Sequence, residues 1–515
     1  MTVHTNRLFL SVGIAFTLIF AVLFSLRLDL FSKIKIGPAI PDALSTGSIP
    51  QRDTWMNIYQ KDRRIGYSRK QFSEADAGYV VQETVFMRIN TMGMIQDVHL
   101  TTTGRLHPDF TLAAVEFNIN SGRFSFSASG RLDGSILAIR TESADTVRNF
   151  TVNLNKKTYL VAGLVNAVGA YGFKPGDRLT LDIFDPVTMS QQPVKIIVED
   201  REEVSIGGVT HATTKILLNF KGANQLAWID DNGEILKEKG LLGIRLEKTT
   251  RADALSEFQI ASSDDLTLFA SVPSNVEFEN PQTIDRLVVK IRGVETDGLH
   301  LSGGRQTLDK DTLTVKKELL TDLPARLTMA KLPLLEKIFL EPGPFVQSDH
   351  EKIKLQVEQI LTDTDGTLLD RAAKLTHWVY ANIEKRPVLS LPDALSTLEN
   401  KEGDCNEHAA LLAAMARASG IPARIETGLV YMRGRFYYHA WNLLYLGKWV
   451  TADAVFDQLP ADVTHLRFAI GTKQQASLMG LIGKVRIEVI AEERAHSGAN
   501  RREATRTNNG KPESL

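Results

Sequence analysis

A long run of strand-forming segments between Trp55 and Leu255 restricts the fold of this chain more than any other feature. Segments such as residues 79–89 are rich in aromatic and β-branched side chains, and turn signals such as Asp231-Asn232-Gly233 separate them. Between Leu160 and Val168 the apolar residues instead follow a helical period. We therefore expect residues 51–256 to form a β-rich domain in which a curved sheet wraps around one apolar helix.

The pattern of this predicted domain resembles the incomplete β-barrel of periplasmic lipoprotein-carrier-like domains. That resemblance implies a lipid or peptide ligand in the concave face of the sheet. A packed scaffold without a ligand is the alternative, and the sequence pattern fits it equally well.

The chain has 515 residues, which is too long for one ordinary hydrophobic core, so we expect several domains. Residues 264–324 contain short strand candidates and are predicted to form a small β domain or spacer. From residue 349 the pattern changes to amphipathic helices followed by strands, which predicts an α+β domain over residues 349–492. The polar residues 493–515 show no period and are predicted to be a disordered tail.

The N-terminal segment 8–26 contains 19 residues without a charge, bounded by Arg7 and Arg27. That length spans a bilayer as a helix. Because no small-residue cleavage site follows, we interpret the segment as a transmembrane signal anchor rather than a cleaved signal peptide. Residues 36–50 contain three prolines and are predicted to link this anchor to the rest of the chain.

The charges around the predicted anchor do not favour export, but long domains are translocated largely regardless of such charges. We expect the bulk of the chain on the periplasmic, extracytoplasmic side of the membrane, because the β-rich domain resembles an envelope domain. The net charge is −1, so no strong field predicts nucleic acid as a partner.

A single cysteine, Cys405, occurs in the chain, so no internal disulfide can form. It is either a buried small side chain or a reactive thiol. It stands at the start of a predicted helix, residues 404–418, which ends before Pro422. The unpaired N–H groups of a helix N-terminus favour a thiolate and can stabilise the oxyanion formed when a carbonyl is attacked. The position therefore favours a nucleophile with a lowered pKa.

His439 and Asp453 lie on two consecutive predicted strands, and the loop between those strands tests whether they can meet. A three-residue loop at residues 446–448 places Asp453 opposite Trp441 and puts His439 and Asp453 on one face as diagonal neighbours. A regular two-residue loop would place them on opposite faces. In the first case Asp453 would orient His439, and His439 would take the proton of Cys405.

Four groups of residues together resemble the core of the transglutaminase-like superfamily. They are Gly403-Asp404-Cys405-Asn406-Glu407-His408, Arg417 to Arg424, His439-Ala440-Trp441, and Trp449 with Asp453. The resemblance covers roughly residues 349–489 and implies a papain-like α+β fold with the catalytic triad Cys405, His439 and Asp453. It does not define the reaction, because such proteins include cross-linking enzymes, peptidases, other amide hydrolases and non-catalytic binding proteins.

Other polar residues near these positions offer alternatives. Glu407 and His408 could form a metal site with Cys405 and His439, but the ligands of zinc sites show tighter paired spacings along the sequence. We therefore expect Glu407 and His408 to brace the helix, and we expect no metal or other cofactor. Asp457 and Asp462 could replace Asp453 as the residue that orients the histidine. His377 and Trp441 are expected to be packing residues, and Asn400 is suggested by analogy as an oxyanion donor.

The sequence therefore predicts a membrane-anchored thiol enzyme of the cell envelope. It would act on amide bonds of peptides or proteins through a thioester intermediate, more as a peptidase or amidase than as a cross-linking transamidase, a preference that rests on family analogy. The alternative is a non-catalytic binding or assembly protein of the envelope that uses the β-rich domain to bind lipid or peptide.

Overall fold

A computed structural model describes residues 51–494, apart from 123, 144–145, 156, 171–173, 187, 221, 259–264, 324–332, 363–365, 389–390 and 472–475. The predicted anchor at residues 8–26, the linker at 36–50 and residues 495–515 of the predicted tail lie outside this part. Among the described residues, no helix is both long enough and apolar enough to cross a membrane.

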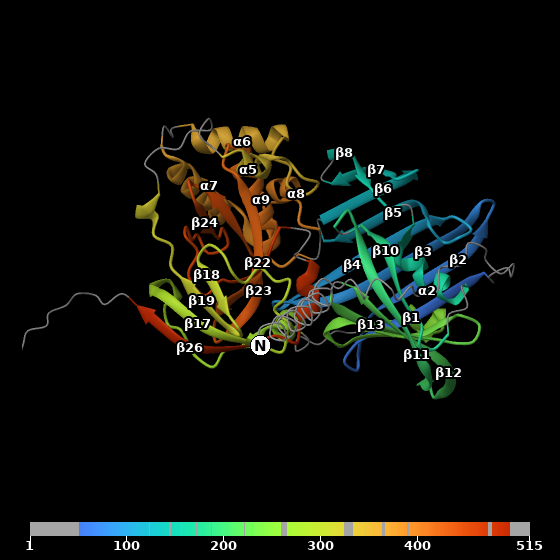
Figure 1. Ribbon diagram of the computed structural model, residues 1–515. Coiled ribbons are helices and arrows are strands. Elements are labelled where there is room, and N and C mark those ends of the chain that lie inside the picture. The colour runs from blue at the N-terminus through green and yellow to red at the C-terminus, as the bar shows by residue number, and fades with distance from the viewer. Residues whose placement is uncertain are drawn as a thin grey trace, which may run out of the picture. The chain divides into compact units, whose positions relative to one another are not determined.

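The described residues divide into two compact units (Figure 1). Unit 1 contains the chain up to Phe269, together with Arg386–Asn400 and Thr472–Ile482. Unit 2 contains Ala270–Lys385, Lys401–Gly471 and the chain from Gly483 onward. The polypeptide therefore leaves unit 2 twice and returns to it each time.

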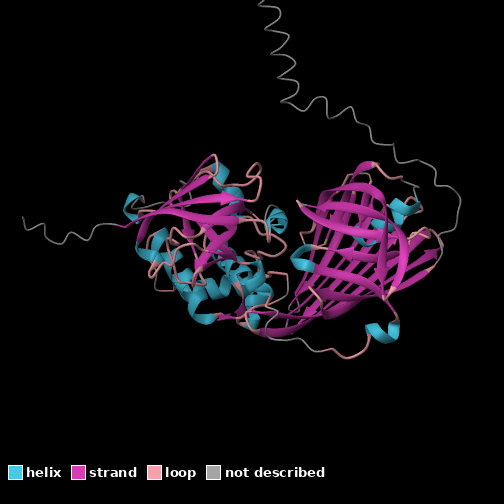
Figure 2. Ribbon diagram, turned by 90° about the horizontal axis from the view of Figure 1, so that it is seen from below, coloured by secondary structure: helices cyan, strands magenta, loops and turns pink. Residues whose placement is uncertain are grey.

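Unit 1 is built on a single curled sheet of 15 strands in the described residues (Figure 2). Its strands are β1 (Arg52–Gln60), β2 (Arg63–Ala75), β3 (Gly78–Thr91), β4 (Met94–Leu106), β5 (Leu112–Ser121), β6 (Phe124–Asp133), β7 (Ile136–Ser143), β8 (Thr146–Asn153), β9 (Thr158–Leu160), β10 (Arg178–Asp185), β11 (Ser190–Ile206), β12 (Val209–Phe220), β13 (Ala223–Ile229), β14 (Ile235–Lys239) and β15 (Ile244–Thr249). The helices here are α2 (Val161–Ala170), η2 (Leu241–Gly243), α3 (Arg251–Ala254), α8 (Ala394–Asn400) and η7 (Ala476–Leu481), and α4 (Leu266–Ala270) leads into unit 2.

The order of the strands explains why this sheet curls. The order runs from β8 down to β1, continues with β15, and then descends to β9, so that the consecutive strands β8 and β9 form its two edges. Only residues 154–157 separate these strands in sequence. Since each residue spans at most about 3.6 Å, the end of β8 and the start of β9 must approach within roughly 18 Å. The sheet is thereby bent into a half-barrel.

Helix α2 packs against β3, β4 and β10 on the apolar face of the sheet. Two glycines permit a close approach between them. A Cβ atom on Gly163 of α2 would lie 2.7 Å from Leu106 Cδ1 of β4, and one on Gly104 of β4 would lie 2.5 Å from Leu160 Cδ2, in the last residue of β9, directly before α2. The predicted curved sheet with one apolar helix is confirmed, and so is the hairpin around Asp231-Asn232-Gly233, which joins β13 to β14.

Unit 2 combines helices with two main sheets. Its strands are β16 (Val272–Pro273), β17 (Ile284–Arg292), β18 (Gln306–Asp309), β19 (Thr312–Lys316), β20 (Glu384–Lys385), β21 (Glu402–Gly403), β22 (Ala423–Met432), β23 (Arg435–Tyr445), β24 (Trp449–Ala452), β25 (Leu466–Ile470) and β26 (Arg486–Arg494). Its helices are η3 (Pro281–Thr283), η4 (Leu320–Asp322), α5 (Leu334–Lys337), η6 (Ile338–Leu340), α6 (Glu351–Leu361), α7 (Leu368–Asn382) and α9 (Cys405–Ala418).

Helix α9 lies at the centre of unit 2, against β22 and β23 on one side and α6 and α7 on the other. Its ten residues from Glu407 to Ala416 are all buried, which explains why alanine and leucine surround most of its circumference. Strand β23 lies between β22 and β24, and β22 also pairs with β25.

The residues predicted as a small β domain or spacer, 264–324, supply strands to the sheets of unit 2. Strand β17 pairs with β26, about 200 residues later in the chain, and β16 pairs with β23. These pairings tie the segment to the unit that carries Cys405.

Candidate active site

The start of α9 holds Cys405 in a fixed position. Asp404 is the N-cap residue, and its side chain accepts the N–H of Asn406 at 2.8 Å. Glu407 completes a capping box by accepting the N–H of Asp404 at 3.0 Å. Cys405 is therefore the first helical residue, as predicted, and the two carboxylates occupy two of the free donors of the helix end.

The turn between β23 and β24 brings His439 and Asp453 together. Tyr445 pairs with Trp449, and Asn442 pairs with Ala452, so the loop has the three residues that the sequence predicts. Gly447 in this loop has φ +105°, which a residue with a side chain rarely adopts. His439 Nε2 lies 2.6 Å from Asp453 Oδ2, in a buried hydrogen bond. The predicted register is confirmed, while the catalytic role of the pair stays a prediction.

The thiol of Cys405 lies against β23 at the residue next to His439. The backbone N–H of Ala440 donates a hydrogen bond to it. Within the described residues, no hydrogen bond joins the thiol to the imidazole of His439. Catalytic hydrogen bonds are often long without substrate and tighten only when substrate binds.

Burial raises the pKa of the Cys405 thiol well above its usual value, and the carboxylates of Asp404, Glu407 and Asp453 act in the same direction. The Ala440 N–H opposes them. The helix N-terminus alone predicts a lowered pKa, but burial, together with the capping carboxylates at that same helix end, raises the pKa of the thiol. A thiol with a raised pKa stays neutral near pH 7 unless a base takes its proton.

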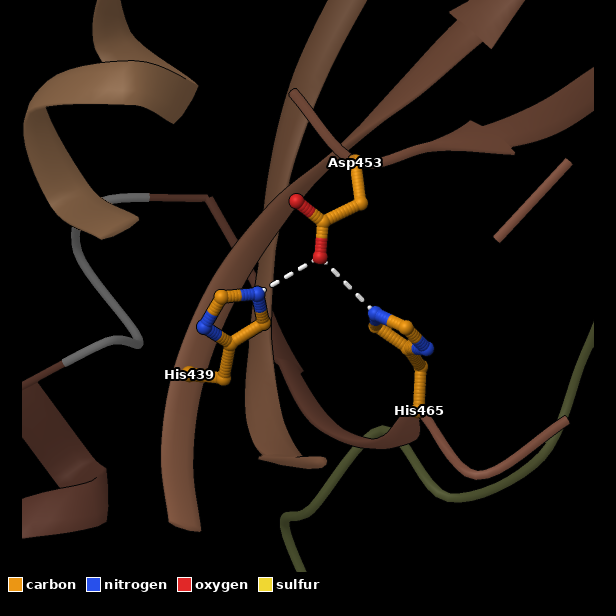
Figure 3. A group of neighbouring side chains, drawn as sticks. All are labelled: His439, Asp453 and His465. Atoms are coloured by element: carbon orange, nitrogen blue, oxygen red, sulfur yellow. Dashed lines mark hydrogen bonds and ion pairs between the residues drawn. The ribbon is translucent and has the colours of Figure 1, made fainter. Parts of the chain in front are cut away.

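Asp453 also binds a second histidine, His465, which the sequence analysis did not single out (Figure 3). His465 Nε2 lies 2.8 Å from Asp453 Oδ2, and His465 Nδ1 lies 3.3 Å from Asp462 Oδ1. The only local signal for this residue is the spacing of three between Asp462 and His465. Its partner Asp453 is reached through the non-local pairing of β25 with β22.

The shifts in pKa follow from this arrangement. Burial would raise the pKa of Asp453, but His439 and His465 hold it well below its usual range. Burial also works against Asp462 ionisation, and His465 outweighs it, so the pKa of Asp462 is lowered. Burial would lower the pKa of His465, but the Asp462 and Asp453 carboxylates raise it to about 9.

This raised pKa predicts that the protein loses stability at alkaline pH. An unfolded histidine has a pKa of about 6.5, so the stabilisation from His465 is complete below that pH and disappears as the pH rises through about 9. Between these limits we expect the wild type to lose on the order of 3 kcal/mol in its free energy of unfolding relative to His465→Gln. Urea unfolding from pH 6 to 9.5 measures the difference. If the free energy of unfolding falls equally with pH in the wild type and in His465→Gln, the prediction is wrong. The control His377→Ala, at an exposed histidine, should show the same dependence on pH as the wild type.

The alternative candidates lie outside the Cys405–His439–Asp453 arrangement. Asp457 pairs with His377 at 2.8 Å. The His377 side chain is 66% exposed, so its predicted packing role is wrong. Asp462 contacts His465 instead of His439. Asn400 ends α8 in unit 1, and its predicted role as an oxyanion donor stays a prediction.

Trp441, Glu407 and His408 have structural contacts. The Trp441 indole is buried and donates to Glu426 Oε2 at 2.7 Å, which agrees with a core position. Glu407 belongs to the capping box. His408 Nδ1 lies 2.7 Å from the backbone oxygen of Asp404, so this residue braces the helix as expected. Burial lowers the pKa of His408, which leaves it neutral.

In the described part of the chain, one group has the composition of a metal site: His439, Asp453 and His465, whose ligand atoms lie within 4.8 Å of one another. Zinc holds such atoms about 2.0–2.2 Å away in a tetrahedron. Ligand atoms only 2.6 and 2.8 Å apart are too close for that geometry. The distances fit direct hydrogen bonds instead.

Comparison with known proteins agrees with the C-terminal assignment. Residues 355–454 match the family model of the transglutaminase-like superfamily. No curated protein sequence matches the chain. The matched segment contains Cys405, His439 and Asp453 and ends before Asp462 and His465.

Three solved structures are similar to parts of the chain. A candidate cysteine protease from Cytophaga hutchinsonii is 18% identical over 40% of this chain and 81% of its own, with a TM-score of 0.26. A β-barrel-like protein of unknown function (DUF1849) from Brucella abortus is 10% identical over 39% and 97%, with a TM-score of 0.31. A candidate protease from Parabacteroides distasonis is 10% identical over 64% of each chain, with a TM-score of 0.19.

All three TM-scores lie below 0.5. The family match covers the start of α9 and the β23–β24 turn described above. The C-terminal part of this chain carries a domain of the transglutaminase-like superfamily at residues 355–454.

Proposed function

We propose that unit 2 is a cysteine-dependent enzyme that cleaves amide bonds of peptides or proteins, with Cys405 as nucleophile, His439 as base and Asp453 as the residue that orients the base. The observation that carries this proposal is the 2.6 Å hydrogen bond between His439 and Asp453. His439 lies on β23, and the next residue on that strand, Ala440, donates its backbone N–H to the Cys405 thiol. The three side chains come from the start of α9, from β23 and from the residue that follows β24.

The chemistry follows from these positions. His439 takes the thiol proton as the sulfur of Cys405 attacks the amide carbonyl, and the backbone N–H of Cys405, which neither capping carboxylate binds, stabilises the oxyanion. His439 then gives its proton to the leaving amine as the C–N bond breaks, which leaves a thioester on Cys405. Water attacks the thioester with help from His439, releases a carboxylic acid and restores the thiol.

An amine could replace water in the last step, and the product would then be a new amide. We favour hydrolysis, by analogy with bacterial members of the superfamily. The neutral resting thiol fits either course, because His439 can ionise it during attack.

The proposal extends to the cell envelope. The uncharged segment at residues 8–26 would anchor the protein in the membrane, with both units on the extracytoplasmic side. Unit 1 would bind a lipid or a peptide on its curled sheet and so recruit substrate. These parts rest on the sequence pattern and on the predicted resemblance of unit 1 to carrier domains.

Incubation of the soluble part, from about residue 50, with envelope peptides tests the proposal. Mass spectrometry distinguishes new peptide termini or deamidated glutamine from new cross-links. We expect new termini with the wild type and His377→Ala, and none with Cys405→Ala. Cross-links would assign a transamidase. Unchanged peptides, with no acyl adduct on Cys405, would reject the enzyme and favour a binding or assembly protein.

A further inference from the structure

A groove of about 600 Å³ lies across the neighbouring strands β4 to β8 of unit 1 (Figure 1). Its charged side chains are those of Arg105, Arg131, Arg140 and Glu116, and we call it the arginine groove. Leu106 on β4 faces α2, so Arg105, the residue before it, points to the opposite face of the sheet. The volume falls within the range of about 300–1,000 Å³ that is typical of ligand sites.

The register of the strands explains why this face is hollowed. Arg105 and Arg131 flank Ala114 in one row across β4, β5 and β6. In the next row, Ser129 of β6 pairs with Arg140 of β7. Because alanine and serine are short, they fill little of the space between the long arginine side chains. The groove is therefore a consequence of which residues alternate along these strands.

The same register determines the spacing of the positive charges. Arg105 and Arg131 stand two strands apart, which separates their backbones by about 10 Å. Arg131 and Arg140 are diagonal neighbours on β6 and β7, about 7–8 Å apart. In an extended peptide, every second side chain projects to the same side at intervals of about 7 Å. Acidic residues at every second position would thus lie within reach of successive arginines.

The charges of the arginine groove are not neutralised by their neighbours. Within the described residues, the side chains of Arg105, Arg131 and Glu116 form no hydrogen bond or ion pair. Arg140 has one long contact, with Glu142 at 3.5 Å, and both of these side chains are more than half exposed. Three guanidinium groups and one carboxylate line the groove, so an excess of two positive charges faces a ligand.

We propose that the arginine groove binds an extended acidic peptide, with glutamate or aspartate side chains at every second position against its guanidinium groups. Guanidinium binds a carboxylate through two parallel N–H groups, which gives geometric specificity as well as attraction. A peptide chain enters a groove, whereas the flat surface of a bilayer does not. The inference names the class of peptide that unit 1 would recruit, so it rests on that part of the proposed function, and it does not involve Cys405.

Fluorescence anisotropy with the full-length protein tests the inference. The probe is a short labelled peptide with glutamate at every second position, and the comparison is the same peptide with glutamine in place of glutamate. We expect the glutamate peptide to bind, to bind less tightly as NaCl screens the charges, and to bind at least about tenfold more tightly than the glutamine peptide. Equal affinity for the two peptides, or binding of neither, would overturn the inference.

Matched double variants locate the binding site. Arg131→Gln combined with Arg140→Gln removes two charges from the groove and should weaken binding by about tenfold or more. Arg88→Gln combined with Arg201→Gln removes two charges from β3 and β11, where each arginine already pairs with an aspartate. This control should keep the Kd within about twofold of the wild type. Equal weakening in the two double variants would show that net charge alone attracts the peptide, and the groove would be rejected.

A substitution with the opposite effect covers the case in which the groove variant does not fold. Glu116→Gln removes the carboxylate that lines the groove and should tighten binding of the glutamate peptide by about threefold. Neither an unfolded protein nor a purely structural role of Glu116 predicts such a gain. An unchanged or weaker affinity would reject the groove.

Vesicles of phosphatidylglycerol test the competing anionic surface. If the vesicles bind through Arg131 and Arg140 and the glutamate peptide does not displace them, the assignment to a peptide is wrong. The outcome is also separable from that of the proposed function. Binding of the peptide at the groove without cleavage of any amide bond contradicts the enzyme alone. Cleavage by a protein that does not bind the glutamate peptide contradicts the groove alone.

Discussion

Replacement of Cys405 by alanine is expected to lower turnover of the amide substrate by about 10⁴-fold or more, because the variant has no nucleophile. His439→Ala should lower kcat by about 10²–10⁴-fold, since the thiol, whose pKa is raised, then has no base. The measurement is kcat on the peptide identified by mass spectrometry, with both variants checked for the wild-type circular dichroism spectrum.

The chain supplies a matched control for this experiment. His377 and Asp457 form another histidine–aspartate pair, with a hydrogen bond of 2.8 Å, on an exposed part of unit 2. His377→Ala should leave kcat within about twofold of the wild type, as expected of a surface substitution. A Cys405→Ala protein that keeps a substantial part of the activity would place the nucleophile elsewhere.

Replacement of Arg467 by methionine is expected to cost about 3–5 kcal/mol in the stability of unit 2, because it removes one partner of a buried ion pair. Arg467 is 5% exposed and its Nη1 lies 3.0 Å from Glu426 Oε1. Its other donors bind the backbone oxygens of His300 and Gly303 at 2.7 and 2.9 Å. Hydrogen exchange of the β22 and β23 amides measures the loss.

Two comparison variants show whether buried charge is the cause. Arg69 forms an exposed pair with Asp53 at 2.6 Å, so Arg69→Ala should cost about 1 kcal/mol or less. Glu426→Gln added to Arg467→Met should restore part of the lost stability, because no unpaired carboxylate then remains inside. If Arg467→Met costs no more than Arg69→Ala, the buried pair is not a source of stability.

The local parts of the candidate site could be predicted from the sequence. Asp404 and Glu407 stand three residues apart before a helical run, which is a capping-box pattern, and they place Cys405 at the first helical position. The number of residues between β23 and β24 determines which side chains share a face, so the contact between His439 and Asp453 follows from counting.

The non-local parts could not be predicted in the same way. His465 reaches Asp453 because β25 pairs with β22, and no short-range pattern predicts that pairing. The pKa of Cys405 depends on burial and on neighbouring carboxylates, which a helix position does not reveal. The strand pattern indicated a curved sheet in unit 1, but the pairing of β1 with β15, which connects its two halves, joins residues almost 200 positions apart.

The two excursions of the chain from unit 2 into unit 1 have a consequence for how such a protein can be divided. Residues 386–400, which precede Cys405, belong to unit 1, and five residues of α8 are buried, from Ala394 to Leu398. A gene fragment cut at the ends of the family match would lack β25, β26 and the strands from residues 272–316, and it would expose α8. An expression clone of unit 2 must therefore begin near Ala270 and replace both excursions with short linkers. For the same reason, no single cut of the chain separates the two units.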